Sequence, residues 1–514
     1  MILYRISKLR FSVFDQFTFV MRKLFPLCLT LFVTATFAAE KPNIVFILAD
    51  DLGWSELGSY GQTKIRTPRL DELAEQGMKF SRAYSGNAVC APSRCVLLTG
   101  KHPGHAEVRN NRAMTRFGEK EGQHPIPAEE VTIAELLAKD GYKSGIFGKW
   151  GLGNMTSTGN PLKQGFDRFF GYNCQGVAHS YYPESLWSDD KIFPLENDPP
   201  VPGHGTLEKG ADPNDPESYA MYKGSDYASD RINEQVLEFV KKNKDEPFFL
   251  YYPTIIPHLA LHVPDEELEP YLKLGWNDPP FTRPKGGYTP HITPRAAYAA
   301  MITRMDRYIG NVLDLLKELK LDDNTIVVFT SDNGATYLDD VDYAFFESVK
   351  PLRGLKGSLY EGGIRVPQIV RWPGKVEPGS ESDFVTGFED WLPTLHEIAG
   401  SKSRIPDTVD GLSIVPTLLG KGQPQREFLY REFGAYGGQQ SVLLGEKWKG
   451  IRQNILNKKS KAPLKIELYD LENDISETKD VSADHPEVVK QIEKLMKSER
   501  FPSETFKIGP LDKL

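Results

Sequence analysis

The sequence predicts an α/β fold, in which a sheet is covered by helices on both faces. Runs that are apolar on both faces belong in the middle of a parallel sheet. Four such runs recur along the chain, at residues 43–49, 145–148, 248–251 and 326–330. Segments with apolar residues at helical spacing alternate with them, chiefly at 68–78 and 297–319. This alternation is typical of a sheet that has helices on both sides.

The N-terminal segment has the pattern of a signal peptide. A short basic start at Met21 precedes an uncharged apolar run at 24–37 and then the Ala38-Ala39 pair. This order predicts a signal peptide over residues 1–39, with Met21 as a candidate true start and cleavage at the alanine pair. The apolar run is too short to span a bilayer. We therefore expect an exported protein, periplasmic or secreted, without a membrane anchor.

The charge of the chain argues against nucleic acid as a partner. The 514 residues include 62 Lys and Arg against 70 Asp and Glu, which gives a net charge of −8. A mildly acidic protein does not attract polyanions through its overall charge. An anionic substrate would therefore need a local basic pocket.

The chain divides by pattern into a large first domain at 40–425 and a smaller α+β domain at 426–514. The second part carries short apolar runs typical of antiparallel strands, at 428–430, 441–444, 448–451 and 465–469, and then a helical pattern at 485–498. The first part contains two long stretches rich in Pro, Gly, Asp and Tyr, at 180–230 and 262–296. Loops of this length are usually functional. Their aromatic residues suit stacking on sugars, although packed loops carry the same types: Tyr181, Tyr182, Trp187 and Trp276.

Acidic and amide side chains directly follow two of the predicted strands. Asp50 and Asp51 come after the run at 43–49, and Asp332 and Asn333 come after the fourth run. In an open α/β sheet, ligand sites lie beyond the carboxyl ends of the strands, so these groups are expected to converge. Calcium takes roughly six to eight oxygen ligands and tolerates irregular geometry. Each pair alone also fits a strand end or a turn, but together they favour a metal site.

The most specific pattern in the chain surrounds Cys90. Residues 90–94 read Cys-Ala-Pro-Ser-Arg, and Leu-Leu-Thr-Gly follows at 97–100. This stretch resembles the signature of the type I, formylglycine-dependent sulfatases. Further family motifs match in order along nearly all of the predicted mature chain: Pro42-Asn43-Ile44, Asp50-Asp51-Leu52-Gly53, Gly148-Lys149-Trp150, Asp332-Asn333-Gly334, Lys356 with Glu361 to Pro367, Glu467 to Leu471, and His485-Pro486-Glu487. The pentapeptide could occur by chance, whereas the complete ordered set is highly specific.

The resemblance implies an alkaline-phosphatase-like sandwich, with a large central mixed sheet flanked by helices. A smaller C-terminal domain with a short antiparallel sheet and a helix would complete it. The implied activity is hydrolysis of sulfate esters, carried by the domain at 40–425. We expect the substrate to be a sulfated small molecule or glycan, and within that class an O-sulfated carbohydrate of galactose type.

In that family the signature cysteine is oxidised to formylglycine by a maturation enzyme, and the hydrate of the aldehyde attacks sulfur. The resemblance assigns this position to Cys90. A geminal diol has one hydroxyl to attack and a second to expel the product, whereas a serine would remain trapped as a sulfate ester. The resemblance also implies one Ca²⁺ ion with the ligands Asp50, Asp51, Cys90, Asp332 and Asn333.

Four further side chains acquire roles through the resemblance. Arg94 would lie one helical turn after the cysteine and stabilise negative charge beside the metal. Lys149 and Lys356 would bind sulfate oxygens, and Lys356 would also stabilise the leaving oxygen. His258 would contact the substrate as general acid for the leaving alcohol, because a histidine pKa near neutrality suits that task. His262 is the alternative for this role.

One position departs from the family pattern. Many members read Gly-Lys-Trp-His-Leu-Gly, and that histidine acts as base when the sulfated diol collapses. Here residues 148–153 read Gly-Lys-Trp-Gly-Leu-Gly, and Gly151 has no side chain for this step. His105 and His179 are the candidate replacements, and both are also candidates for substrate binding. In that case His179 would contact a sugar hydroxyl from the pocket wall.

Two other functions stay open at the level of sequence. A phosphate or phosphonate ester hydrolase of the same superfamily would usually replace the cysteine signature, or would use zinc held by several histidines. The sequence contains no obvious His-rich set of that kind. A catalytically silent carbohydrate-binding homologue would result if Cys90 were never modified.

Overall fold

The computed structural model of the chain describes residues 41–113, 122–283, 285, 287–459 and 464–513. Residues 41–514 form one compact unit. The predicted signal peptide at 1–39, with its candidate start at Met21, lies outside the described residues. Within the described part, no helix is both long enough and apolar enough to cross a membrane.

The larger sheet has the strand order β10-β2-β9-β8-β1-β7-β3-β4-β5-β6, and β11 pairs with β2. Strands β8, β1, β7, β3 and β4 run parallel, whereas β9, β2, β5 and β6 include antiparallel pairings, so the sheet is mixed as expected. The strands in chain order are β1 (Asn43–Ala49), β2 (Met78–Tyr84), β3 (Lys143–Lys149), β4 (Arg168–Tyr172), β5 (Ser185–Ser188), β6 (Lys191–Pro194), β7 (Phe248–Pro253), β8 (Thr325–Ser331), β9 (Arg365–Arg371), β10 (Ser380–Ser382) and β11 (Thr386–Gly387).

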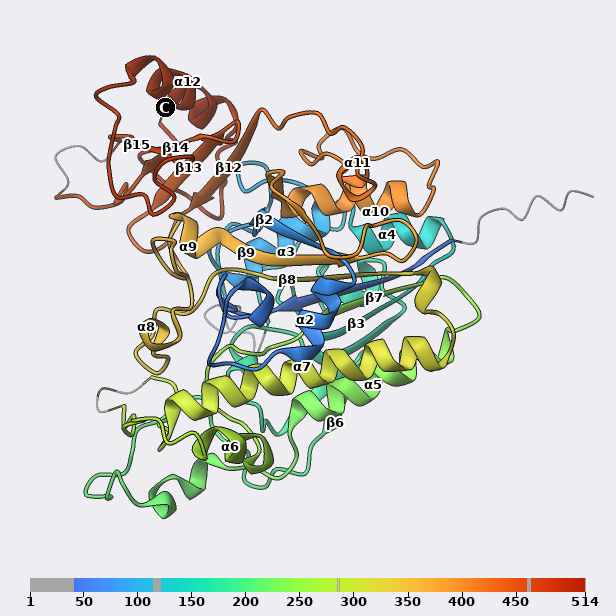
Figure 1. Ribbon diagram of the computed structural model, residues 1–514, viewed down its shortest axis with the longest axis vertical. Coiled ribbons are helices and arrows are strands. Elements are labelled where there is room, and N and C mark those ends of the chain that lie inside the picture. Colours follow the sequence, from blue (N-terminus) through green and yellow to red (C-terminus); the bar gives the residue numbers. More distant parts are fainter. Residues whose placement is uncertain (1–40, 114–121, 284, 286, 460–463, 514) are drawn as a thin grey trace, which may run out of the picture. The chain divides into compact units, whose positions relative to one another are not determined.

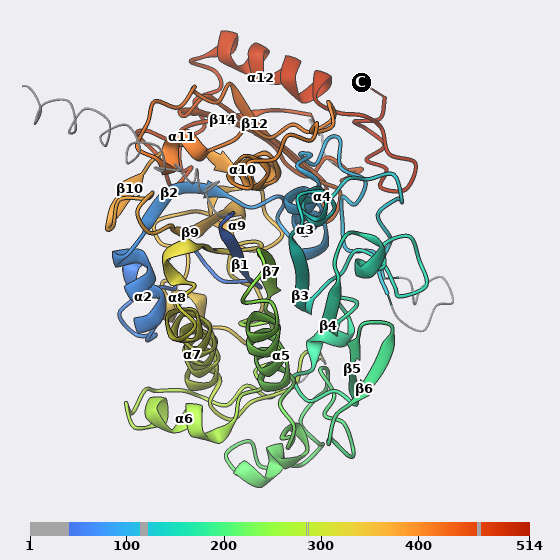
Figure 2. The same cartoon turned by 90° about the vertical axis from the view of Figure 1, so that its right-hand side faces the viewer.

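Helices cover both faces of this sheet, as the sequence predicted (Figure 1). One layer contains α2 (Pro68–Glu75), α5 (Ala228–Lys242) and α7 (Pro294–Glu318), and the other contains α3 (Cys90–Thr99), α4 (Ile133–Lys139) and α10 (Trp391–Ile398). The turned view separates the same layers (Figure 2). Because side chains alternate along a strand, Val45 and Ile47 of β1 pack with the first layer, and Phe46 and Leu48 pack with the second. Further helices lie in the loops: α6 (Asp265–Leu272), α8 (Tyr343–Phe346), α9 (Glu361–Ile364) and α11 (Val415–Leu418).

A second, smaller sheet forms from the C-terminal part of the chain. Its antiparallel strands are β12 (Phe428–Phe433), β13 (Gln439–Leu444), β14 (Trp448–Arg452) and β15 (Glu467–Asp470), in that order. The helix α12 (Pro486–Ser498) packs Ile492 and Met496 against Val442 and Leu468 of this sheet. The expected short antiparallel sheet and helix are therefore confirmed.

The two long stretches are more ordered than the sequence suggested. The stretch 180–230 contains β5, β6 and part of α5, and 262–296 contains α6. Tyr181 is fully buried and Tyr182 is 5% exposed, so both belong to the core instead of a sugar-binding wall. The hydroxyl oxygen of Tyr181 lies 2.8 and 2.7 Å from the backbone carbonyl oxygens of Ile255 and His258, so its single proton is shared between two acceptors in the loop after β7.

Candidate active site

The ends of four neighbouring strands bring the predicted polar residues together. Strands β8, β1, β7 and β3 are adjacent and parallel, so their carboxyl ends share one edge of the sheet. Ala49 pairs with Ser331, which places Asp50 and Asp51 beside Asp332 and Asn333. Lys149 is the last residue of β3, and His258 lies in the loop after β7. The convergence expected from strand-end positions is the observed arrangement.

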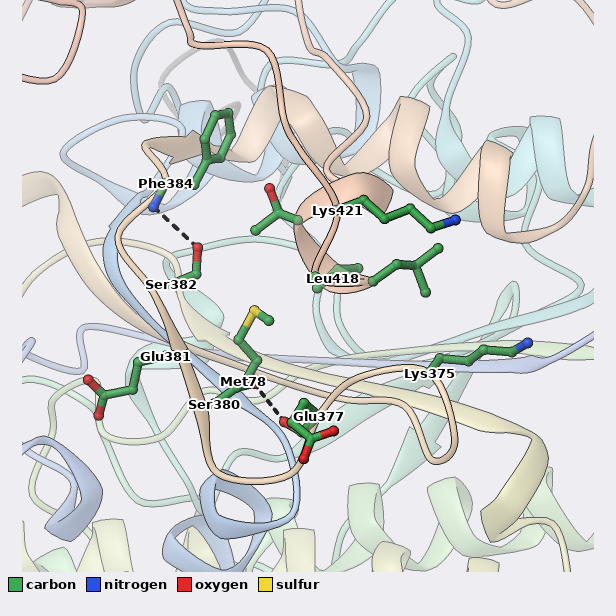
Figure 3. A pocket seen from close by; sticks show the side chains of 12 residues that line it. Met78, Lys375, Glu377, Ser380, Glu381, Ser382, Phe384, Leu418 and Lys421 are labelled. Atoms are coloured by element: carbon green, nitrogen blue, oxygen red, sulfur yellow. Dashed lines mark hydrogen bonds between the residues drawn. The ribbon is translucent and has the colours of Figure 1, made fainter.

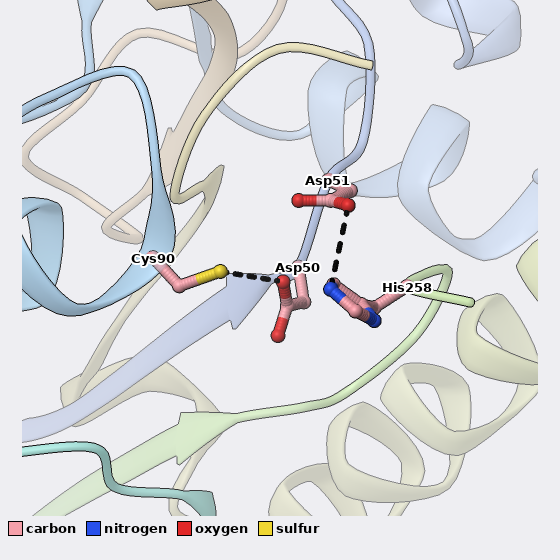
Figure 4. Close-up of side chains that lie close together, drawn as sticks. All are labelled: Asp50, Asp51, Cys90 and His258. Atoms are coloured by element: carbon pink, nitrogen blue, oxygen red, sulfur yellow. Dashed lines mark hydrogen bonds and ion pairs between the residues drawn. The ribbon is translucent and has the colours of Figure 1, made fainter. Parts of the chain in front are cut away.

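Cys90 is the first residue of α3 and lies at the centre of this group. Its Sγ atom is 3.5 Å from Asp50 Oδ1, 3.6 Å from Lys149 Nζ and 3.8 Å from Lys356 Nζ. Figure 4 shows the thiol directed at Asp50, with Asp51 and His258 beside it. The positive end of a helix dipole adds to these cations. A nucleophile built on Cys90 would therefore stand in an electropositive, buried pocket.

The acidic groups form a cluster that suits a metal ion. Ligand atoms of Asp50, Asp51, Cys90 and His258 all lie within 4.8 Å of one another. Asn333 donates its amide N–H to Asp51 Oδ1 at 2.8 Å, while its own Oδ1 is buried and has no hydrogen-bond partner among the described residues. An orphaned amide oxygen beside carboxylates is the kind of ligand that a hard cation such as calcium takes.

Three cations balance the three carboxylates of the cluster. Arg94 donates to Asp332 Oδ2 at 2.8 Å and to Asp50 Oδ2 at 3.2 Å. Lys149 Nζ donates to Asp50 Oδ2 at 2.6 Å, and Lys356 Nζ donates to the Asp51 carboxylate at 2.7 Å. The protein charges of the site thus cancel, and a divalent cation would leave it positive and suited to an anion.

The charges also set the protonation states of the site. Burial alone would raise the pKa of Asp50, but the positive charges of Lys149 and Arg94 hold it well below its usual value. Burial, together with the nearby Asp50, raises the pKa of the Cys90 thiol to about 12. The unmodified thiol is therefore a poor nucleophile, since it is the thiolate that attacks.

His258 and His179 form the histidine side of the site. The His258 ring stacks on His179 at 5.2 Å and 9°, and its Nε2 lies 3.7 Å from Asp51 Oδ2. His179 Nδ1 lies 2.8 Å from His204 Nε2, and the His204 ring stacks on Tyr288. Burial, aided by the neighbouring Lys356, places the pKa of His258 well below its usual value, and burial with His258 does the same for His179. His262 instead bonds Thr289 Oγ1 at 3.0 Å.

The structure does not bring His105 to this cluster. Its ring contacts His102, Asp410 and Phe501. His105 follows the C-terminal end of α3, whereas Cys90 starts that ten-residue helix, and such a helix is about 15 Å long. The expectation that His105 acts as base or binds substrate is corrected by this placement.

Two residues that the sequence did not predict support the acidic cluster. Ser331 Oγ accepts from the backbone N–H of Leu52 and donates to the carbonyl of Asn333, both at 2.9 Å, so it ties the ends of β1 and β8 together. Glu56 accepts from the N–H of Gly53 at 2.6 Å and from the Tyr298 hydroxyl at 2.8 Å. Ser331 could have been suspected from its place before Asp332, whereas nothing in the sequence marks Glu56.

A pair of exposed aromatic residues borders the site. Tyr337 and Tyr436 are 40% and 54% exposed, and their hydroxyls lie 3.0 Å apart. A Cβ atom on Gly357 would meet the Tyr436 ring at 3.1 Å, so this ring covers the backbone next to Lys356. The pair went unnoticed in the sequence because it joins segments from both parts of the chain.

The pocket of Figure 3 is a separate feature. It has a volume of about 530 Å³ and is lined by residues of β10, α11 and their neighbours, among them Met78, Ser380 and Leu418. None of its lining residues belongs to the Cys90 cluster. It therefore contributes nothing to the candidate active site.

Comparison with known proteins agrees with the geometry. The model of the Sulfatase family matches residues 42–401, and the model described as N-sulphoglucosamine sulphohydrolase, C-terminal, matches residues 355–501. The N-acetylgalactosamine-6-O-sulfatase of Bacteroides thetaiotaomicron is 32% identical over 90% of this chain and 93% of its own length. The human N-acetylgalactosamine-6-sulfatase is 32% identical over 82% of this chain and 75% of its own length.

The comparison with solved structures agrees with the comparison of sequences. The crystal structure of Ps i-CgsB superposes with a TM-score of 0.71 and 27% identity, covering 89% of this chain and 92% of that one. That protein has also been crystallised in complex with k-i-k-neocarrahexaose. With a family match over more than half of its length and a cysteine, acids and cations gathered at one sheet edge, the chain belongs to the sulfatase family.

Proposed function

We propose that this sulfuric ester hydrolase removes O-sulfate groups from carbohydrates of galactose type. The observation that carries the proposal is the position of Cys90 Sγ, within 3.8 Å of Asp50, Lys149 and Lys356. The N-acetylgalactosamine 6-sulfatases among its relatives, and the oligosaccharide complex of Ps i-CgsB, support a sulfated sugar as substrate. The signal-peptide pattern supports export.

Cys90 is the residue at which we expect formylglycine, and we expect Ca²⁺ to be held by Asp50, Asp51, Asp332, Asn333 and the modified Cys90. When formed, the formylglycine hydrate supplies a hydroxyl nucleophile for sulfur, and the ion supplies positive charge beside it. The orphaned Asn333 Oδ1 and the close carboxylates favour this ligand set. The three cations then serve the anionic substrate.

Lys149 and Lys356 bind the sulfate oxygens in this proposal, and Arg94 holds the acids in place. The lysine Nζ atoms approach Cys90 Sγ to 3.6 and 3.8 Å, so a sulfate bound at Cys90 would lie within reach of both. Arg94 is 1% exposed and bridges Asp332 and Asp50, so it orients the carboxylates and does not face solvent. Charge-assisted hydrogen bonds of this kind are stronger than neutral ones.

His258 is the proposed general acid for the leaving alcohol. Its Nδ1 lies 2.6 Å from the Leu259 carbonyl, which favours a proton on Nδ1 and directs Nε2 into the site. The low pKa of the ring means that it is neutral before substrate binds. The negative charge of a bound sulfate favours the protonated ring, which can then give its Nε2 proton to the leaving oxygen.

His179 keeps two proposed roles, as the base that replaces the histidine missing at Gly151 or as a contact for a sugar hydroxyl. The stacking of its ring on His258 supports a role in the site. Its lowered pKa keeps the ring unprotonated, and it could act as a base only when the negative charge of a sulfated intermediate beside it raises that pKa. The exposed pair Tyr337 and Tyr436 is proposed as a surface on which a sugar ring stacks.

Two measurements test the proposed function. Mass spectrometry of the Cys90 peptide from natively expressed protein is expected to show the aldehyde in place of the thiol. Sulfate release from a sulfated galactose-type sugar is expected to disappear in Cys90→Ala and after chelation. An unmodified thiol in active protein would contradict the nucleophile, and phosphate ester turnover without sulfate ester turnover would favour the phosphohydrolase alternative.

A further inference from the structure

The place of a side chain at residue 151 is filled by another residue. Gly151 has φ +90°, a left-handed conformation that favours glycine. A Cβ atom built there would lie 2.0 Å from Gln175 Nε2. The Gly151 N–H donates to the carbonyl of Asn173 at 3.1 Å, which fixes the two loops against each other. Gln175 therefore occupies the space that a side chain at residue 151 would fill.

The amide of Gln175 is buried and unpaired. The residue is 5% exposed, and neither its Nε2 nor its Oε1 has a hydrogen-bond partner among the described residues. Burying an unpaired amide is costly, and the large majority of such groups in native proteins are satisfied. A ligand that bonds to the amide would explain why the group is kept.

The loop that carries Gln175 is bounded by the active site at both ends. At its start, the backbone N–H of Trp150, next to Lys149, donates to the Tyr172 carbonyl at 2.9 Å. At its end, the 3-10 helix Val177–His179 leads to the ring that stacks on His258. Along the chain, Gln175 thus lies between the residues that bond to the segment after Lys149 and the histidine that stacks on His258.

We infer that Gln175 is a substrate-binding residue, whose Nε2 donates a hydrogen bond to an oxygen of the sulfate group. The inference rests on the proposed function. An amide has no basic site near neutral pH, so Gln175 can bind the anion but cannot take the proton that a histidine at position 151 would take. Binding and proton transfer, which one histidine could combine, are then divided between Gln175 and a separate base.

The test compares Gln175→Leu with a matched buried glutamine. Gln164 is 1% exposed and donates to the Thr158 carbonyl at 2.9 Å, while its Oε1 is also unpaired. Replacing Gln175 removes an unpaired amide, so Gln175→Leu is expected to keep or raise Tm. Replacing Gln164 removes its hydrogen bond to the Thr158 carbonyl, so Gln164→Leu is expected to lower Tm and to leave sulfate binding unchanged.

Binding of inorganic sulfate to the full chain with Ca²⁺ present, measured by calorimetry, is the first readout. Gln175→Leu is expected to weaken it on the order of tenfold, the worth of one hydrogen bond to a charged group. KM for the sulfate ester is expected to rise by a similar factor. Gln175→Met repeats the measurement with a more adaptable side chain should the leucine variant not fold.

The possible outcomes distinguish failure of the binding role of Gln175 from failure of the proposed function. If both Gln175 variants bind sulfate as the parent does, or lose Tm as Gln164→Leu does while their binding is unchanged, the inference is overturned. If the parent hydrolyses no sulfate ester but its sulfate binding depends on Gln175, the proposed function fails and the binding role stands. Hydrolysis by the parent with unchanged constants in both variants overturns the binding role alone.

Discussion

Lys149 Nζ donates to Asp50 Oδ2 at 2.6 Å, and neither side chain is exposed to solvent. Breaking a buried pair leaves an uncompensated charge and costs about 3–5 kcal/mol. Lys149→Ala is therefore expected to lower the free energy of unfolding by this amount and to reduce kcat/KM by at least two orders of magnitude. Chemical denaturation and steady-state kinetics measure the two effects.

The control for this prediction is Lys273→Ala. Lys273 pairs with Glu269 at 2.8 Å on the surface, where both side chains are more than 60% exposed. Such pairs are worth about 0–1 kcal/mol, so stability and activity should stay near those of the parent. Equal stability of the two variants would mean that Asp50 is compensated by something other than Lys149.

Removal of the metal is expected to weaken the fold as well as the activity. Asp50, Asp51 and Asp332 lie close together, and burial with the neighbouring Asp50 raises the pKa of Asp332 to about 6. A bound cation relieves this repulsion, and an ion present at about a thousand times its Kd adds about 4 kcal/mol of stability. A chelator should lower Tm and abolish turnover, and calcium should restore both better than magnesium. Unchanged Tm and turnover would contradict the metal site.

The site residues were predictable where chemistry follows a strand directly. Asp50 and Asp332 could be paired in advance because both end buried runs, and parallel strands share a carboxyl edge. The neighbours of each strand could not be predicted, since pairing depends on contacts far apart in sequence. The expected role of His105 was wrong for this reason, because its distance from Cys90 depends on the length and direction of α3.

The aromatic and amide residues were harder to place for a related reason. Tyr181 in a Pro- and Gly-rich stretch suits a sugar wall and a packed core equally well, and only its full burial decides. Gln175 becomes a candidate binding residue only through its contact with Gly151, which lies 24 positions earlier in the chain. Tyr337 and Tyr436 meet across two parts of the chain. Composition and periodicity contain no information on such pairs.

Glu56 should give the protein a measurable pH dependence of stability. Burial raises its pKa from 4.5 to about 7, so the folded chain holds a proton that the unfolded chain has released between these values. The contribution of this proton to the free energy of unfolding is complete below about pH 4.5. It is lost as pH rises through 7, and the loss is at most about 3 kcal/mol. Glu56→Gln should flatten this part of the curve of unfolding free energy against pH. Glu129→Gln, at an exposed position, is the control, and identical slopes in both variants would contradict the assignment.

His179→Ala distinguishes the two roles proposed for that residue. If His179 is the base for release of the product, the first turnover should remain fast while the steady-state rate falls by about 10²–10⁴. If it binds a sugar hydroxyl, KM should rise and the ratio of burst to steady-state rate should not change. His204→Ala removes the 2.8 Å contact with His179 Nδ1 and should show a weaker form of the same effect. Rapid-quench kinetics reads both phases, and a loss of binding alone would refute the base.

Tyr436→Ala tests whether the exposed aromatic pair binds sugar. The ring is 54% exposed, lies over Gly357 beside Lys356, and contacts Tyr337 at a centroid distance of 5.6 Å. Loss of one aromatic contact of about 0.5–1.5 kcal/mol should raise KM for a sulfated oligosaccharide roughly threefold to tenfold.

Tyr436→Phe keeps the ring and loses the hydroxyl contact, so it should bind the oligosaccharide as the parent does. Tyr343→Ala, at another exposed tyrosine in α8, controls for a general effect of exposed aromatics. Because inorganic sulfate has no ring to stack, its binding should be the same in all three variants, and a parallel loss there would place Tyr436 in the sulfate pocket instead of a sugar subsite.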